Sequence, residues 1–149
     1  MRLWHYKMIP YLPNSQLWLI AQWRELNSIF KNQNKHILIN YVYEYDKANL
    51  LYYTKFVLDE MISRGFKNIK MDNYLKYFEG YVVTKLYDDG HAEIVAYQDA
   101  IKNPFQNHHN DRYLMQCFYN LQEKYDRGQK DFSAKQYKKL EEFIKNEIH

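Results

Sequence analysis

The sequence predicts a mostly α-helical (all-α) fold, packed as a single compact domain over residues 1–149. The chain has only four glycines and three prolines, which is too few for the many turns of an all-β domain. Apolar residues recur at helical spacing in several segments, and residues typical of helix ends flank those segments. A chain of 149 residues is long enough to bury a core without disulfides or a structural metal.

The first long helix is predicted from Asn14 or Ser15 to about Lys31. It follows Pro10 and Pro13, and either Asn14 or Ser15 can cap its first turn. Its apolar residues fall within one arc of the helical wheel and are expected to face the core. These residues are Leu19, Trp23, Leu26, Ile29 and Phe30.

A second helix is predicted to begin after Asp46, its N-cap, and to end at Arg64. Gly65 follows, where a helix commonly needs a left-handed residue. Leu50, Val57 and Met61 are expected on its apolar face. The preceding residues, 36–45, alternate poorly and fit either an extended segment or a short helix.

The middle of the chain is less regular. Residues 81–87 fit either a short strand or a loop, and Asp88-Asp89-Gly90 indicates a turn. Ala92–Ile101 reads as a helix that stops before Asn103-Pro104, since the residue before a proline avoids the helical region.

Two further helices are predicted near the C-terminus. One covers Tyr113–Tyr125 and closes near Gly128. Ser133 and Gln136 have the spacing of a capping box and open the last helix. The residues expected to face inward on that helix are Tyr137, Leu140, Ile144 and Ile148.

Composition narrows the function classes only slightly. A net charge of +3 permits nucleic-acid binding without requiring it, because affinity depends on local phosphate contacts. Cys117 is the sole cysteine, so no intrachain disulfide forms, and we expect this thiol to be buried. No apolar run approaches the length that crosses a bilayer, so we expect a cytoplasmic protein without a membrane partner. We also expect it to be a monomer.

Tyrosine is unusually abundant, with 16 residues. Its ring packs in a core while its hydroxyl reaches water, so these tyrosines fit an ordinary core and its rim. They also fit a surface on which nucleic-acid bases stack. Composition leaves both interpretations open.

Four short segments follow one another in a distinctive order. They are Trp23-Arg24-Glu25-Leu26, Lys35-His36, Tyr45-Asp46-Lys47 and Ser63-Arg64-Gly65-Phe66. In this order they resemble the pyrimidine-dimer DNA glycosylase family, and the resemblance covers roughly residues 1–70. It implies a compact α-helical fold, no metal or other cofactor, and a damaged double-stranded DNA substrate. It also implies a kinked duplex with a nucleotide flipped out opposite the lesion.

The resemblance also implies roles for individual residues. The attacking group falls on the α-amine of Met1, and the assisting carboxylate falls on Glu25. Arg2 and Arg24 correspond to arginines that hold phosphates beside the lesion. Ser28 stands where the family has a further arginine, so the lesion that is excised can differ.

The chemistry of these groups is consistent with that assignment. A free α-amine titrates near pH 7.7–8.0, so a useful fraction is neutral and nucleophilic at cellular pH. It can attack C1′ of a damaged nucleotide and expel the base, leaving an imine. The imine acidifies the C2′ proton and permits strand cleavage by β-elimination. A nearby carboxylate stabilises the cationic sugar and transfers protons.

Four other residues are candidates for DNA contact. Lys35 and His36 match a Lys-His pair of the family and are expected at the DNA backbone, although a surface histidine is an equal interpretation. Arg127 and Lys130 lie in a basic turn between the last two helices. They are expected to contact phosphate or the minor groove, and the alternative is a loop with a capping role.

A metal site is the weakest candidate. His108, His109 and Asp111 have side chains that can bind a metal ion. Adjacent histidines rarely bind one ion by themselves, and the sequence has neither an HExxH motif nor a cysteine pair. We therefore expect no metal.

These observations predict a DNA-repair enzyme, a glycosylase with abasic-site lyase activity on damaged duplex DNA, most naturally at pyrimidine dimers. Two alternatives remain at this point. One is a non-catalytic helical module of the same fold that binds nucleic acid or protein. The other is a glycosylase for a different lesion.

Overall fold

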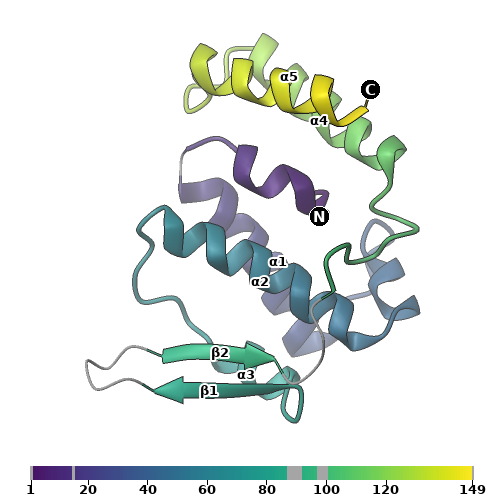
Figure 1. Cartoon of the computed structure of the whole chain (residues 1–149), viewed down its shortest axis with the longest axis vertical. Helices are drawn as coiled ribbons and strands as arrows, with labels where there is room; N and C mark the ends of the chain where they lie inside the picture. The colour runs from purple at the N-terminus through teal and green to yellow at the C-terminus, as the bar shows by residue number, and fades with distance from the viewer. Residues whose placement is uncertain (1, 15, 87–91, 97–100, 149) are drawn as a thin grey trace.

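Helices form most of the structure, a computed structural model that describes residues 2–14, 16–86, 92–96 and 101–148 (Figure 1). The predicted mostly helical fold is therefore confirmed. In chain order the helices are η1 (Tyr6–Tyr11), α1 (Gln16–Asn32), η2 (Asn40–Glu44), α2 (Lys47–Ser63), α3 (Asp72–Tyr77), α4 (Asp111–Asp126) and α5 (Ala134–Ile148). A two-stranded hairpin, β1 (Val82–Leu86) and β2 (Ala92–Ala96), lies between α3 and α4 in the sequence.

Local capping explains the bounds of α2, as predicted. The Asp46 carboxylate accepts a hydrogen bond from the backbone N–H of Ala48 at 2.9 Å. At the other end Gly65 has a φ of 86°. The N–H groups of Gly65 and Phe66 donate to the carbonyls of Ile62 and Met61, which is the Schellman arrangement that satisfies the last carbonyls of a helix.

The C-terminal helices also obey their sequence signals. Gly128, with a φ of 86°, follows α4. Before α5, the backbone N–H of Ser133 donates to Gln136 at 3.1 Å, and that of Gln136 donates to the Ser133 hydroxyl at 3.2 Å. This is the predicted capping box. The inward position predicted for Ile148 is wrong, because its side chain is 38% exposed in the last turn of α5.

The helix predicted over Ala92–Ile101 is wrong for its first half. Ala92–Ala96 forms β2, which pairs antiparallel with β1 in the register Val83↔Val95 and Lys85↔Glu93. The register also pairs Val or Thr with Val or Ile at Val83↔Val95 and Thr84↔Ile94, and these residue types favour strands. Backbone pairing with β1 therefore outweighs the weak helical preference of a five-residue segment. Residues 97–100 and the turn predicted at Asp88-Asp89-Gly90 lie outside the described residues.

The two other ambiguous regions are now assigned. Residues 40–44 of the 36–45 segment form η2, a short 3-10 helix. The strand interpretation of residues 81–87 is confirmed for β1. The sequence did not predict α3, a helix of only six residues that packs against α1.

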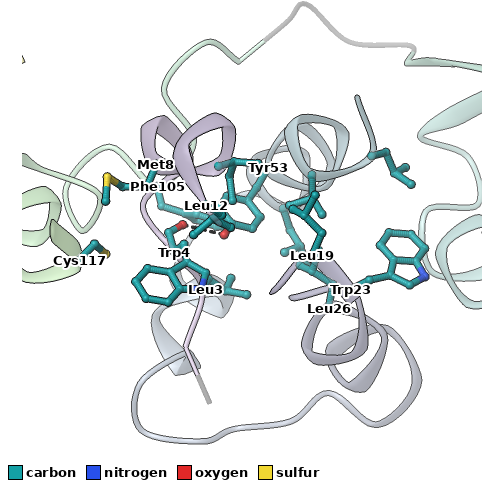
Figure 2. Packing of buried hydrophobic residues seen from close by; sticks show 14 of the residues in the cluster. Leu3, Trp4, Met8, Leu12, Leu19, Trp23, Leu26, Tyr53, Phe105 and Cys117 are labelled. Carbon is teal, nitrogen blue, oxygen red and sulfur yellow. Dashed lines mark hydrogen bonds between the residues drawn. The ribbon is translucent and has the colours of Figure 1, made fainter. Parts of the chain in front are cut away.

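The N-terminal segment lies in the middle of the molecule. In Figure 1, η1 lies between the α1–α2 pair and the α4–α5 pair, and it contacts α2, α4 and α5. Figure 2 shows Leu3 and Met8 of this segment packed among three residues from other parts of the chain. These are Tyr53 of α2, Phe105 of the segment before α4, and Cys117 of α4. All five are fully buried, and the stripe predicted for α1 is buried with them. The beginning of the chain is thus part of the core.

Candidate active site at the amino end

The first described residues are fixed by hydrogen bonds to their backbone. Leu3, Trp4 and His5 are buried. The backbone N–H of Trp4 donates to Gln22 Oε1 at 2.9 Å, and Gln22 Nε2 donates to the carbonyl of Arg2 at 3.1 Å. From α4, the Tyr113 hydroxyl donates to the carbonyl of Leu3. This segment is therefore held on both sides, by α1 and by α4.

Glu25 directs its carboxylate at the start of the chain. Its Oε2 accepts the backbone N–H of Arg2 at 3.2 Å and the side-chain amide of Gln22 at 3.1 Å. Gln22 and Glu25 are three residues apart on α1 and so lie on the same face of the helix. Burial raises the pKa of the Glu25 carboxyl, and the hydrogen bonds from Arg2 and Gln22 partly oppose that rise.

Gln22 connects the whole arrangement, and it was missed by reasoning from the sequence. It is 2% exposed, and both ends of its amide are used. The Tyr53 hydroxyl lies 2.6 Å from the carbonyl of Trp4 (Figure 2). It also lies 3.0 Å from Gln22 Oε1. A glutamine one turn before Glu25 on the same helical face is the signal that points to this role, because a polar residue there is placed to orient the carboxylate.

Arg24 and Arg2 differ in their surroundings. Arg24 is exposed on α1, next in sequence to Glu25. Arg2 is half-buried, and its guanidinium carbon lies 6.0 Å from the centre of the Trp4 ring. Its side chain also lines a groove of about 400 Å³ between α4 and Leu38. Arg2 thus contacts the Glu25 carboxylate through its backbone N–H, and Arg24 adjoins Glu25 in the sequence.

Residues 1–74 match the sequence model of the pyrimidine dimer DNA glycosylase family. The resemblance predicted from the four short segments is thereby confirmed. The match contains Arg2, Gln22, Arg24 and Glu25, and it spans η1, α1, η2 and α2. It ends within α3, so α4 and α5 lie outside it. No curated protein and no solved structure matches the chain.

Within the family match, Lys35 and His36 lie in the exposed loop between α1 and η2. His36 Nδ1 accepts the backbone N–H of Leu38 at 3.2 Å. The backbone N–H of His36 donates to Asn34 Oδ1 at 2.9 Å. The ring thus stabilises its own turn. Because Leu38 lines the groove beside Arg2, the loop adjoins the candidate site.

Outside the family match, Arg127 and Lys130 lie in the exposed turn between α4 and α5. Arg127 Nε donates to Glu123 Oε1 at 3.1 Å, and both side chains are largely exposed. The turn contacts α1 where Trp18 Nε1 donates to Asp131 Oδ2 at 2.8 Å. Trp18 precedes Glu25 by seven residues, which is about 10 Å along the same face of the helix. The turn is therefore adjacent to the candidate site without being part of it.

Two buried histidines form a second cluster that the sequence did not reveal. His109 Nδ1 accepts the backbone N–H of Tyr6 at 3.3 Å, and its Nε2 lies 2.6 Å from the Tyr41 hydroxyl. Burial lowers the pKa of His109 to about 2 and that of His5 to about 4. The rings of His5 and His109 lie 5.3 Å apart. Both are therefore neutral and fix η1 to the segment before α4.

Neither a metal centre nor a membrane span is found in the described chain. Across residues 2–14, 16–86, 92–96 and 101–148, histidine, cysteine, aspartate and glutamate side chains form no group of three that could hold a metal ion. His108 Nδ1 is hydrogen-bonded to the Tyr45 hydroxyl, and His108 Nε2 lies 3.5 Å from Glu44 Oε2. In the same ranges, no helix combines the length and the apolar content needed to cross a membrane.

Proposed function

We propose that the chain is a DNA glycosylase with abasic-site lyase activity on damaged duplex DNA, with pyrimidine dimers as its lesion. The family match supports a glycosylase that acts on DNA. One structural observation carries the assignment to a site. The Glu25 carboxylate accepts the backbone N–H of Arg2 at 3.2 Å, which supports a role for Glu25 as the acid–base group near the amino end of the chain.

The proposed nucleophile directly precedes this contact in the sequence. Met1 is the residue before Arg2, so its α-amine is the group that the proposal pairs with Glu25. Glu25 is the only proposed catalytic side chain, and Met1 supplies the amine.

The proposed reaction needs only these two groups. The neutral amine forms a bond to C1′ while the C1′–base bond breaks, and the base leaves with a proton. Opening of the sugar ring then gives an imine between the amine and C1′. Removal of a C2′ proton expels the 3′ phosphate, and water finally hydrolyses the imine. Glu25 stabilises the cationic sugar and carries the protons, and its raised pKa suits it to do so nearer neutral pH.

The proposed DNA contacts surround this pair. Arg2 and Arg24 would hold phosphates beside the reacting sugar, since guanidinium groups bind phosphate oxygens in bidentate fashion. Lys35 and His36 would contact the backbone from the loop, and Arg127 and Lys130 from the α4–α5 turn. In this proposal residues 1–149 act as one domain, and the protein binds DNA as a monomer.

Borohydride trapping tests the proposal. The protein is mixed with a duplex that carries an abasic site or a cyclobutane thymine dimer, and borohydride reduces any imine to a stable adduct. We expect an adduct with the unmodified protein, with its loss after acetylation of the α-amine and a decrease of at least tenfold in Glu25→Gln. Glu141→Gln, an exposed substitution on α5, is the matched control.

The same experiment contains the outcome that contradicts the proposal. An unblocked protein that binds either duplex but forms no adduct is a non-catalytic binding module. An adduct with the abasic duplex alone would retain the lyase activity and assign base release to a lesion other than the dimer.

A further inference from the structure

Two large apolar side chains are exposed next to each other in the loop between α1 and η2. Ile37 is 78% exposed and Leu38 is 46% exposed. Single apolar residues scattered over a protein surface are ordinary. Here two are adjacent, although the next residue, Ile39, is fully buried. The pair is therefore a candidate contact surface, and we call Ile37 and Leu38 the loop tip.

Hydrogen bonds define the turn that carries the loop tip. The carbonyl of His36 accepts the backbone N–H groups of Ile39 and Asn40, both at 2.9 Å. His36 Nδ1 accepts the backbone N–H of Leu38 at 3.2 Å. Because Ile39 is packed in the core, one end of the turn is fixed there. The turn thus keeps the side chains of Ile37 and Leu38 outside the core.

The surroundings of the loop tip favour a polyanion as its partner. The chain has no aspartate or glutamate from residue 26 to residue 43, and this stretch contains Lys31 and Lys35. Both lysines are exposed. Arg2, which lines a groove together with Leu38, adds a third cation. Nucleic acid combines the two features that this surface would bind, since its phosphates are anionic and its bases present apolar faces.

The loop tip also adjoins the candidate active site. Leu38 and Arg2 line the same groove, and the backbone N–H of Arg2 donates to Glu25 Oε2. A duplex that is held by Arg2 therefore passes beside the loop tip. Aliphatic side chains, isoleucine and leucine among them, insert between neighbouring base pairs in proteins that kink DNA.

We infer that Ile37 is a wedge that enters the duplex at a base step beside the damaged nucleotide, with Leu38 packed against the neighbouring base. The inference rests on the proposed function and adds to it the residues that deform the substrate. Insertion unstacks the two base pairs of the step and kinks the duplex, which is compatible with a nucleotide flipped out opposite the lesion. Lys35 holds an adjacent phosphate, so the cation contributes affinity while the wedge contributes deformation.

The fluorescence of 2-aminopurine, which rises when this base loses its stacking neighbours, tests the wedge. The duplex carries a tetrahydrofuran abasic analogue, which cannot form an imine, and 2-aminopurine beside it. The experiment therefore measures binding without chemistry. We expect the unmodified protein to raise the fluorescence of the bound duplex, and Ile37→Ser to lose most of that increase. Ile37→Met keeps a long apolar side chain and should restore it.

Two further variants separate the wedge from ordinary phosphate binding. Lys35→Ala should lower the salt dependence of the affinity by about one phosphate contact and keep the fluorescence increase of the bound complex. Ile37→Ser should do the reverse, with an unchanged salt dependence. Ile62→Ser, at a 59% exposed position on α2, is the matched control and should change neither quantity. Thermal melts check that the variants fold, as expected at exposed positions.

The inference is overturned if the protein does not bind this duplex, or if Ile37→Ser raises the fluorescence as much as the unmodified protein does. If Ile37→Ser instead converts a dimer of the free protein into a monomer, the loop tip is a self-association surface.

Borohydride trapping on a duplex with a true abasic site, run in parallel, distinguishes the failure of this inference from that of the proposed function. An adduct without a fluorescence increase that depends on Ile37 contradicts the wedge alone. An increase that depends on Ile37, without an adduct, supports the wedge and contradicts the proposed chemistry.

Discussion

At the scale of single residues, the candidate site depends on a glutamine rather than on charged groups alone. Gln22 is buried, and it contacts the backbone of Arg2 and Trp4 as well as the Glu25 carboxylate. A buried amide is costly unless its donors and acceptor are all bonded. Here that requirement is met only when the N-terminal segment lies along α1, so Gln22 couples folding to the position of Glu25.

Replacing Gln22 by leucine tests this coupling. Gln22→Leu keeps the side-chain volume but leaves the N–H of Trp4 and the carbonyl of Arg2 without partners. Each unpaired buried group costs about 1–3 kcal/mol. We expect the free energy of unfolding, measured in urea, to fall by roughly 2–4 kcal/mol, and the rate of adduct formation to fall as Glu25 loses its orientation.

Gln106→Leu is the matched control, because Gln106 is exposed before α4. It should leave the unfolding curve and the adduct rate unchanged. A Gln22→Leu protein that unfolds like the unsubstituted chain would show that Gln22 does not hold the N-terminal segment.

At the scale of elements, the sequence predicted those whose ends are determined locally. The Asp46 cap, the glycines at 65 and 128 and the capping box of α5 each involve residues no more than a few positions apart, and all were predicted. The strand Ala92–Ala96 was predicted as helix, because its conformation depends on pairing with β1. Local patterns contain no information about such a partner.

The same distinction applies to the candidate site. Glu25 and Arg2 were predicted as site residues from the family resemblance, and Glu25 lies on the helix predicted for it. Gln22 was missed because its partners lie 18 and 20 residues away in the chain. The His109 contact with Tyr6 spans 103 residues. The groove requires α4 to lie beside Arg2, which no local pattern predicts.

The α4–α5 pair stabilises the amino end from the side opposite α1. Tyr11 of η1 stacks on Phe143 of α5, with ring centres 4.3 Å apart. The backbone N–H of His5 points at the sulfur of Cys117 on α4, at 3.5 Å. The two C-terminal helices therefore support the site even though the family match does not include them.

A substitution that creates a cavity beside α5 tests that support. Leu140 is fully buried, and Leu140→Ala should lower the free energy of unfolding by about 2–5 kcal/mol. Lys139→Ala, at the exposed neighbouring position, should change it by less than about 0.5 kcal/mol. Chemical denaturation followed by circular dichroism measures both. Equal stabilities for the two variants would mean that α5 packs only loosely on the rest of the chain.

At the scale of the whole molecule, the buried histidines make stability depend on pH. His5 and His109 have folded-state pKa values lowered by burial to about 4 and about 2, against about 6.5 in the unfolded chain. Below pH 6.5 the unfolded chain binds protons that the folded chain does not. Stability is therefore complete above pH 6.5 and declines as the pH falls toward 4.

His5 alone should contribute a loss of about 2 kcal/mol between pH 7.5 and pH 5. Urea unfolding at the two pH values measures the loss. His5→Asn keeps an acceptor for the Lys7 N–H that His5 Nδ1 now binds, and it should show a smaller loss. His36→Asn, at an exposed position, should behave like the unsubstituted protein. Identical losses in all three proteins would show that His5 is charged in the folded state.

The central proposal is that the α-amine of Met1 forms the covalent intermediate and that Glu25 assists it. Its most direct test is to locate the sugar in the reduced adduct by proteolysis and mass spectrometry. The account predicts that the peptide carrying Met1 has gained the deoxyribose remnant at its α-nitrogen. A remnant on a lysine side chain, with the terminal peptide unmodified, would contradict it.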